Sequence, residues 1–429
     1  MPRRWWRRAA PDEECEEPGS HLARAMAYET LVVAFTAVAV AVLVFVVSRG
    51  QFEDLYVKAG GVETSDEVVL LSIGEEALYL WDPADPEPEV TSRALLGQLV
   101  RFADAAGARV VVLDVLLDRP AEDIPLLDAA RAAQAPVVGA TRFATTDPVS
   151  GAEFAAGLAP IYGELIHPGF ANLQVEEPWL FSEVKLVRRA PLQRQVSTAR
   201  LGGPWPMNIV GAEQSDEATI ESLALVAARL AGADPVIDED PLLIAFSGPE
   251  QAGSIPTVRA SAALRALGAS ALAEAMGVEM PVTVPPEIAA VMEGRVVVIG
   301  RVDAAADDRF VTPYSWPLLV GEDMAGARVQ ATLIDQLITG RRITSVAGAA
   351  GWVPALALVA LVFLSRRKLR DDVHAAGWVV VSLALVGGGI MLFRATDVAF
   401  DVGPSIGGIL VTLVSVHVWE WAVDESRRT

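Results

Sequence analysis

Ala108–Leu113 reads ARVVVL, a run of aliphatic, mostly β-branched residues that is typical of a strand buried on both faces. Before it, Ser92–Ala106 places its leucines at helical intervals, and a second apolar run, Glu67–Ile73 (EVVLLSI), precedes that helix. After it, Asp123–Ala133 has a helical pattern and Ala135–Gly139 is a further short strand. Strands that alternate with helices predict parallel pairing in one sheet, with helices on its faces.

The same alternation continues along the chain, with a more exposed β region in the middle. Trp81–Glu89 is rich in proline and acidic residues and is expected to be a loop. The fold class is therefore α/β, with a mixed, mainly parallel sheet flanked by helices. The later elements expected are β segments at Phe170–Val175 and Val184–Gln195, a helix at Glu217–Ala231, a strand at Leu242–Phe246, a helix at Ser261–Met276, a strand at Arg295–Ile299 and a helix at Met324–Ile338.

The composition points to a membrane protein that carries an acidic domain. Of 429 residues, 52% are hydrophobic and only 21% are charged, and the formal net charge is −21. All of this net charge falls between residues 50 and 345, because the flanking parts carry equal numbers of acids and bases. Such an acidic surface excludes a nucleic-acid partner. A single cysteine and four scattered histidines give no disulfide framework, no metal-ligand spacing and no indication of a cofactor.

Four apolar stretches are long enough to cross a bilayer, which takes roughly 20 helical residues. A cleaved signal peptide is the alternative for the first stretch. We favour an uncleaved anchor, because no small-residue cleavage site follows the run at Ser48–Phe52. The fold class therefore also includes an α-helical membrane bundle of four spans. The predicted spans are residues 30–48, 346–364, 377–393 and 404–422.

Basic residues flank these spans unevenly, and the side that carries them is expected to be cytoplasmic. Arginines precede the first span, four basic residues fill the loop between the second and third spans, and two more follow the fourth. The chain is thus expected to be a multi-pass protein of the cell (inner) membrane, in contact with the lipid bilayer, with both termini cytoplasmic. The expected parts are a cytoplasmic tail at 1–29, an extracytoplasmic domain at 49–345, a cytoplasmic loop at 365–376, a short extracytoplasmic loop at 394–403 and a cytoplasmic tail at 423–429.

Carboxylates gather where two predicted strands end. Asp114 ends the Ala108–Leu113 strand, and Asp303, Asp307 and Asp308 follow the Arg295–Ile299 strand. Carboxylates at the carboxyl ends of strands can bind a cation or a ligand. A solvated loop with a turn-capping aspartate, and for Asp114 an arginine partner, is the alternative. No set of residues predicts a catalytic site.

Five stretches together resemble the CHASE (type 2) extracytoplasmic sensor domain of bacterial signalling proteins. They are Leu70–Ile73, Val110–Val115 ending in Asp114, Leu186–Leu192 (LVRRAPL), Leu243–Pro249 and Gly294–Gly340. The resemblance implies a sensor block at 49–345 between one span and three closely spaced spans. It adds Arg188, Arg189 and Thr312 to the ligand-binding candidates Asp114, Asp303, Asp307 and Asp308. It makes Gly326, Gln330 and Gly340 candidates for signal coupling.

The sequence departs from the family pattern at several of these positions. Gly74, Glu75 and Glu76 stand where the family has Ile-Asp-Asp, Val184 and Lys185 replace its Asp-Gly, and Gln330 replaces its histidine. The family usually continues into a cytoplasmic output domain, whereas only Asp424–Thr429 follow the fourth span here.

The resemblance implies a sensor that binds a ligand or protein partner outside the membrane. It would pass its state to a separate cytoplasmic output protein in trans, and a homodimer is implied by analogy. A scaffold subunit that does not switch is the alternative function, and an enzyme is not expected.

Overall fold

The computed structural model divides the chain into two compact units. One, here called the sheet unit, comprises Glu53–Ser345 and Ile390–Ala399; the other, the flanking unit, comprises Met1–Phe52, Val346–Gly389 and Phe400–Thr429. The structure describes residues 64–84, 91–117, 124–143, 155–156, 162, 165–176, 186–197, 217–237, 241–246, 255–275, 282–303, 308–314, 323–346, 357–358, 360–361, 371–396, 398–400 and 409.

Six parallel strands form the central sheet of the sheet unit, in the order β11-β1-β12-β2-β3-β5. A seventh strand, β4 (Ala155–Ala156), pairs antiparallel with the end of β3. The predicted α/β class with a mainly parallel sheet is therefore confirmed. The parallel strands are β1 (Val68–Ile73), β2 (Val110–Leu116), β3 (Val137–Phe143), β5 (Ile166–Phe170), β11 (Thr257–Arg259) and β12 (Val296–Arg301).

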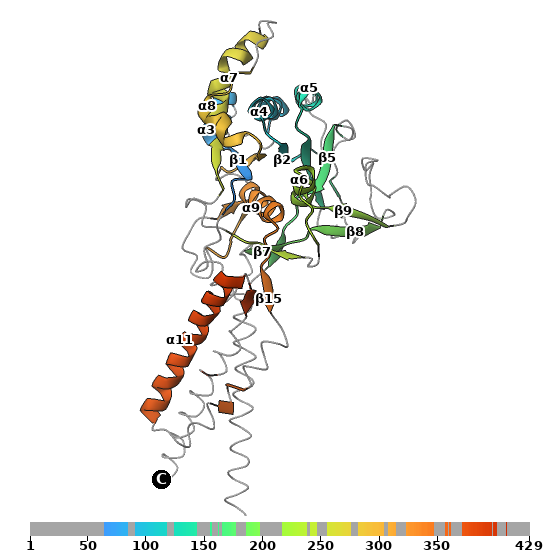
Figure 1. The fold of residues 1–429 in the computed structure, drawn as a ribbon. Helices are drawn as coiled ribbons and strands as arrows, with labels where there is room; N and C mark the ends of the chain where they lie inside the picture. Colours follow the sequence, from blue (N-terminus) through green and yellow to red (C-terminus); the bar gives the residue numbers. More distant parts are fainter. Residues whose placement is uncertain are drawn as a thin grey trace, which may run out of the picture. The chain divides into compact units, whose positions relative to one another are not determined.

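Helices cover both faces of this sheet (Figure 1). Five pack on one face around a common apolar core, and two pack on the other. The first group is α3 (Glu75–Trp81), α4 (Arg93–Ala105), α5 (Ile124–Ala132), α7 (Ala260–Ala275) and α8 (Pro286–Met292). The second is α6 (Leu223–Leu230) and α9 (Gly326–Thr339).

The strands and helices form where the sequence pattern places apolar residues. All six residues of β1 are buried, as expected for a strand covered on both faces. In α4 the buried leucines Leu95, Leu96 and Leu99 share one face, and each contributes roughly 1.5–3 kcal/mol by leaving water. Ser92 caps this helix, since its Oγ accepts a hydrogen bond from the Leu95 N–H at 3.5 Å.

Within the described residues, four small sheets lie outside the central one, and they account for two wrong predictions. Glu217–Glu221 was predicted as helix but is strand β9, because it pairs along its length with β8 (Gln193–Ser197). Within Leu242–Phe246 only β10 (Leu242–Leu243) is strand, and it pairs antiparallel with β7 (Leu186–Ala190) instead of joining the parallel sheet. The other short strands are β6 (Gln174–Glu176), β13 (Arg309–Phe310), β14 (Met324–Ala325), β15 (Thr344–Val346) and β16 (Val398–Phe400).

The face of the sheet on which the following helix packs changes at β12. After β1 and β2 the chain continues into helices on the five-helix face, whereas after β12 it continues into α9 on the opposite face. β12 lies between β1 and β2, so a topological switch point flanks it on both sides. In open α/β sheets, ligands bind at such points, beyond the carboxyl ends of the strands.

Gly340 ends α9 with a left-handed backbone, at φ +66° and ψ +15°. We expect Gly340→Ala to lower the stability of the sheet unit by about 1 kcal/mol, because a Cβ is strained in this conformation. Urea unfolding of the full chain in micelles, followed by circular dichroism, measures the change. Gly74→Ala is the matched control, since Gly74 has φ −108° and open space around its Cα. Equal stability of the two variants would contradict the expectation.

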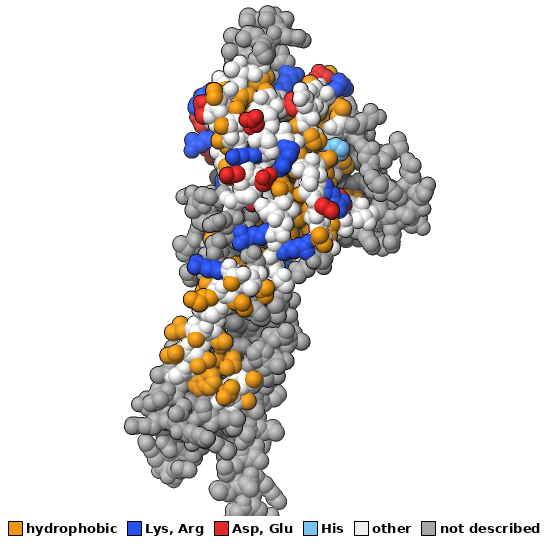
Figure 2. All heavy atoms as spheres, viewed as in Figure 1, with side chains coloured by type: hydrophobic (Ala, Val, Ile, Leu, Met, Phe, Trp, Pro, Cys, Tyr) orange, Lys and Arg blue, Asp and Glu red, His pale blue; other side chains and the backbone are white. Residues whose placement is uncertain are grey.

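The flanking unit is described in part. α11 (Asp371–Thr396) includes the predicted span 377–393, and Trp378 packs there against Ile409, with Leu358 and Leu385 beside them. These residues come from the second, third and fourth predicted spans. Hydrophobic side chains dominate the described surface of α11, in contrast to the mixed charges of the sheet unit (Figure 2). In the part of the chain that the structure describes, no helix is long and apolar enough to qualify as a membrane crossing. The first predicted span lies outside the described residues.

Candidate functional site

Three residues stand side by side where β1, β12 and β2 end. Ser72 of β1 is in register with Gly300 of β12, and Gly300 is in register with Asp114 of β2. Neighbouring residues in parallel strands point to the same face, which here is the face covered by α9. The predicted strand-end position of Asp114 thus coincides with the switch point around β12.

Gly300 allows α9 to approach the sheet at this row. A Cβ built on Gly300 would lie 2.4 Å from the Ala327 Cβ and 3.4 Å from the Asp114 Cβ. Because Gly300 has no side chain, the first turn of α9 can lie directly over the end of β12, beside Asp114. We call the group Asp114, Gly300, Asp308 and Gly326 the carboxylate site.

Asp308 reaches the same place from the loop that follows β12. Its backbone carbonyl accepts a hydrogen bond from the Gly326 N–H at 2.8 Å. Its carboxylate lies against Gly326, so that a Cβ there would come 1.8 Å from Oδ2. Gly326 is the first residue of α9, whose amino-terminal end favours negative charge.

The environment of Asp114 favours the protonated form of its carboxyl. Some of the residue's surface is exposed, but surrounding protein atoms desolvate the carboxyl group. Desolvation first, and then the charge of Asp308, raise the pKa of Asp114 to about 8. At neutral pH the site therefore holds a neutral carboxyl beside Asp308, and it gains a second negative charge as the pH rises.

Asp303 does not belong to this pair. The buried Asp303 carboxylate accepts two hydrogen bonds from Arg301, from Nε at 2.9 Å and from Nη2 at 2.6 Å. Such a fork-like ion pair satisfies the carboxylate internally. Asp307 lies outside the described residues.

The remaining ligand-binding candidates lie beside the loop of Asp308. Thr312 is buried and follows Val311, whose carbonyl accepts the Val187 N–H of β7 at 2.9 Å. The next residues of β7 are Arg188, which is buried, and Arg189, which is partly exposed. The structure thus places β7 next to the 308–312 segment, but the two arginines belong to a separate small sheet.

The three signal-coupling candidates lie along α9, with Gly326 at its start and Gly340 at its end. Gln330 is buried, and its Nε2 donates to the Ala171 carbonyl at 2.8 Å. Its Oε1 is buried without a hydrogen-bond partner among the described residues. Farther along, Asp335 accepts hydrogen bonds from Ser65, and burial raises the pKa of Asp335. The helix is buried almost throughout, so it links these points as one packed body.

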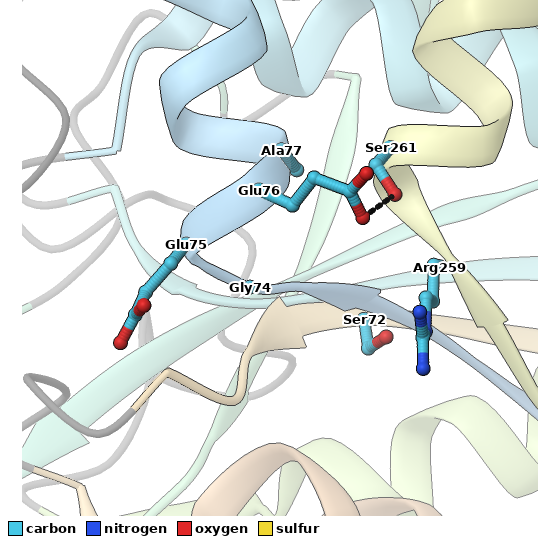
Figure 3. A pocket seen from close by; sticks show the side chains of 7 residues that line it. All are labelled: Ser72, Gly74, Glu75, Glu76, Ala77, Arg259 and Ser261. Carbon is cyan, nitrogen blue, oxygen red and sulfur yellow. Dashed lines mark hydrogen bonds between the residues drawn. The ribbon is translucent and has the colours of Figure 1, made fainter.

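A pocket of about 210 Å³ opens at the neighbouring ends of β1 and β11 (Figure 3). Its lining residues are Ser72, Gly74, Glu75, Glu76, Ala77, Arg259 and Ser261. Glu76 accepts a hydrogen bond from the Ser261 Oγ at 2.9 Å and pairs with Arg265. This hydrogen bond, followed by the charge of Arg265, lowers the pKa of Glu76.

The sequence did not point to this pocket. Thr257–Arg259 is a three-residue strand without the long apolar run of its neighbours, so β11 was not predicted. Glu75–Trp81 was not predicted as a helix, because it is short and leads into the Pro-rich segment. The one available signal was Glu75 and Glu76, which stand where the resembling family has two aspartates.

The carboxylate site can exchange a proton near neutral pH, and it can attract a cation when both acids are ionised. Within the described ranges, no group of three or more metal-binding side chains comes together. The site therefore offers two carboxylates and the end of a helix.

The described part is thus a doubly wound α/β domain with acidic groups and a pocket at the carboxyl ends of its strands, where open α/β sheets commonly bind ligands. The CHASE2 domain family matches residues 30–365, and the chain belongs to this family. CHASE2 domains are sensor domains that are typically extracytoplasmic in membrane proteins, so the match implies a signal-sensing role. No curated protein and no solved structure matches the chain.

Proposed function

We propose that this protein is a membrane-anchored input protein of bacterial signal transduction. Residues 49–345 lie outside the cytoplasm, and both termini lie inside. The observation that carries the proposal is the carboxylate site at the first turn of α9, within a CHASE2 domain. A change at this site acts directly on the helix that leads toward residue 346.

α9 is suited to transmit such a change because it is a packed body with contacts at both ends. Its first turn touches Gly300 and Asp308, and its last turns hold β10 through Gln336. The Gln336 Oε1 accepts the Ala245 N–H at 2.8 Å, and its Nε2 donates to the Leu243 carbonyl at 2.9 Å. A ligand or proton that binds one position of α9 better than another shifts the population of the two positions.

The lipid bilayer is the proposed partner of the flanking unit. Val380 and Leu383 of α11 are exposed apolar side chains of this unit, and exposed apolar surface is typical of membrane contact. We propose that a cytoplasmic output protein binds the basic loop at 365–376 and responds to its state. Replacing Arg366, Arg367, Lys368 and Arg370 by glutamine should then abolish recruitment of that protein and leave the sheet unit folded.

The proposed topology is tested by thiol labelling, because Cys15 is the only cysteine. In intact cells, a membrane-impermeant maleimide should leave Cys15 unmodified and should modify a Cys15→Ser, Arg131→Cys variant. Arg131 is a suitable site because its side chain is exposed on α5. After lysis both proteins should react. Labelling of Cys15 but not of residue 131 in intact cells would overturn the topology.

Signal transmission is tested by disulfide crosslinking between residues 30–48 and 346–364 in a Cys15→Ser background. Asp114→Asn imitates the protonated carboxyl, so at pH 9 it should give the crosslinking pattern that the wild type gives at pH 6. Arg131→Gln, at an exposed position on α5, should follow the wild type at both pH values. If the pattern is the same in all three proteins at every pH, the scaffold function is the better description.

A further inference from the structure

The pocket at the ends of β1 and β11 carries one positive and one negative side chain without a direct hydrogen bond or ion pair among the described residues, although the charge of Arg259 also lowers the pKa of Glu76. No hydrogen bond or ion pair joins the Arg259 guanidinium or the Glu75 carboxylate to another described side chain. Glu76 is different, because Ser261 and Arg265 hold it. Figure 3 shows Glu75 and Arg259 at opposite ends of the pocket, with Gly74 and Ser72 between them.

The floor between these charges is partly polar. Ser72 is 7% exposed, and its Oγ donates a long hydrogen bond of 3.4 Å to the Val258 carbonyl. The Oγ can still accept a hydrogen bond from a ligand. Gly74 contributes no side chain, and Ala77 is buried and apolar. The volume of about 210 Å³ is below the range of drug-sized pockets, so it suits a metabolite of few heavy atoms.

The charges restrict the class of that metabolite. A simple anion would pair with Arg259 but would meet the carboxylates of Glu75 and Glu76. A simple cation would pair with Glu75 but would be repelled by Arg259. A molecule with both an ammonium and a carboxylate group satisfies both side chains, and its carboxylate can take two hydrogen bonds from the guanidinium.

We propose that the pocket between β1 and β11 binds a small zwitterion of the amino-acid type, with its carboxylate on Arg259 and its ammonium group on Glu75. This inference deepens the proposed function by naming a ligand class, and it rests on that function only for the signal that the ligand conveys.

The pocket is connected to α9 through the strands that form it. Ser72 is in register with Gly300, on which Ala327 of α9 packs. The Arg328 Nη2, also in the first turn of α9, donates to the Thr257 Oγ1 of β11 at 3.2 Å. Thr257 is two residues before Arg259, so α9 contacts both strands that end at the pocket. A bound zwitterion therefore restrains the same helix that the carboxylate site restrains.

Calorimetric titration of the full chain in nanodiscs tests the ligand class. The probes are glycine, β-alanine and γ-aminobutyrate, with butyrate and butylamine as singly charged analogues of the last. We expect at least one zwitterion to bind with a dissociation constant below about 10 mM, and both analogues to bind about 10-fold more weakly or worse. Equal binding of butyrate, or no binding of any of the three zwitterions, would overturn the assignment.

Variants locate the binding site. Arg259→Gln and Glu75→Gln each remove one charge from an exposed side chain, and each should weaken binding of the zwitterion about 10-fold. Arg131→Gln removes an exposed arginine far from the lining residues and should leave the affinity unchanged. All three should melt like the wild type without ligand. Wild-type affinity in Arg259→Gln would refute the proposed site, whereas binding without any change in span crosslinking would refute only the signalling function.

Discussion

Gly300→Ala is expected to lower the stability of the sheet unit by about 1–3 kcal/mol. The new Cβ would lie 2.4 Å from the Ala327 Cβ, which is fixed to the backbone of α9 and cannot turn away. Either α9 moves off the sheet or β12 shifts within it, and both changes weaken a packed interface. Urea unfolding of the full chain in micelles measures the loss, and hydrogen exchange of peptides from α9 and β12 shows where it occurs.

Gly268→Ala is the matched control. Gly268 lies within α7 with open space around its Cα, so alanine there should stabilise the helix by roughly 0.5–1 kcal/mol. The two substitutions add the same methyl group and should differ in sign. If Gly300→Ala is as stable as the wild type, the close approach of α9 to β12 is wrong, and with it the proposed route from the carboxylate site to the spans.

The sequence predicted the secondary structure correctly where burial alone determines whether a segment forms a strand or a helix. The strands at 68–73, 110–116 and 296–301 are buried on both faces along most of their length, and their aliphatic runs indicate this burial. The helices α4 and α9 were placed to within a few residues, because their apolar faces recur at helical spacing.

The sequence predicted the secondary structure poorly where pairing with another strand determines it. Glu217–Glu221 has no strong strand pattern of its own, and its pairing with β8 makes it a strand. The three residues of β11 are strand because β1 provides an edge beside them. Pairing of this kind depends on residues far away in the chain, which local periodicity does not contain.

The candidate site was predicted in part for the same reason. Carboxylates at strand ends are visible in the sequence, so Asp114 and Asp308 could be named. That they share one site with Gly326, while Asp303 pairs with Arg301, depends on where Asp303 and Asp308 lie relative to α9. The role of Gly300 depends on the position of α9 over the strand. Neither can be obtained from spacing along the chain.

The ionisation of Asp114 should lower the stability of the wild-type sheet unit as the pH rises from about 4 to about 8. The pKa of Asp114 is 3.8 without the fold and about 8 within it, so the folded state binds the proton more tightly. The stabilisation is complete below the lower value and is lost as the pH passes the higher one, at up to about 1.4 kcal/mol per pH unit. Above pH 8 no further loss is expected from this group.

Asp114→Asn should remove this pH dependence, because asparagine is neutral and of the same shape as the protonated acid. The variant should therefore melt at a higher temperature than the wild type at pH 9, and the difference should vanish near pH 4. Asp128→Asn, an exposed aspartate on α5, should keep the slope of the wild type. Thermal unfolding of the three full-length proteins from pH 4 to pH 9 decides the point. If Asp114→Asn and the wild type have parallel curves, Asp114 is ionised in the fold, and a proton cannot be what the carboxylate site exchanges near neutral pH.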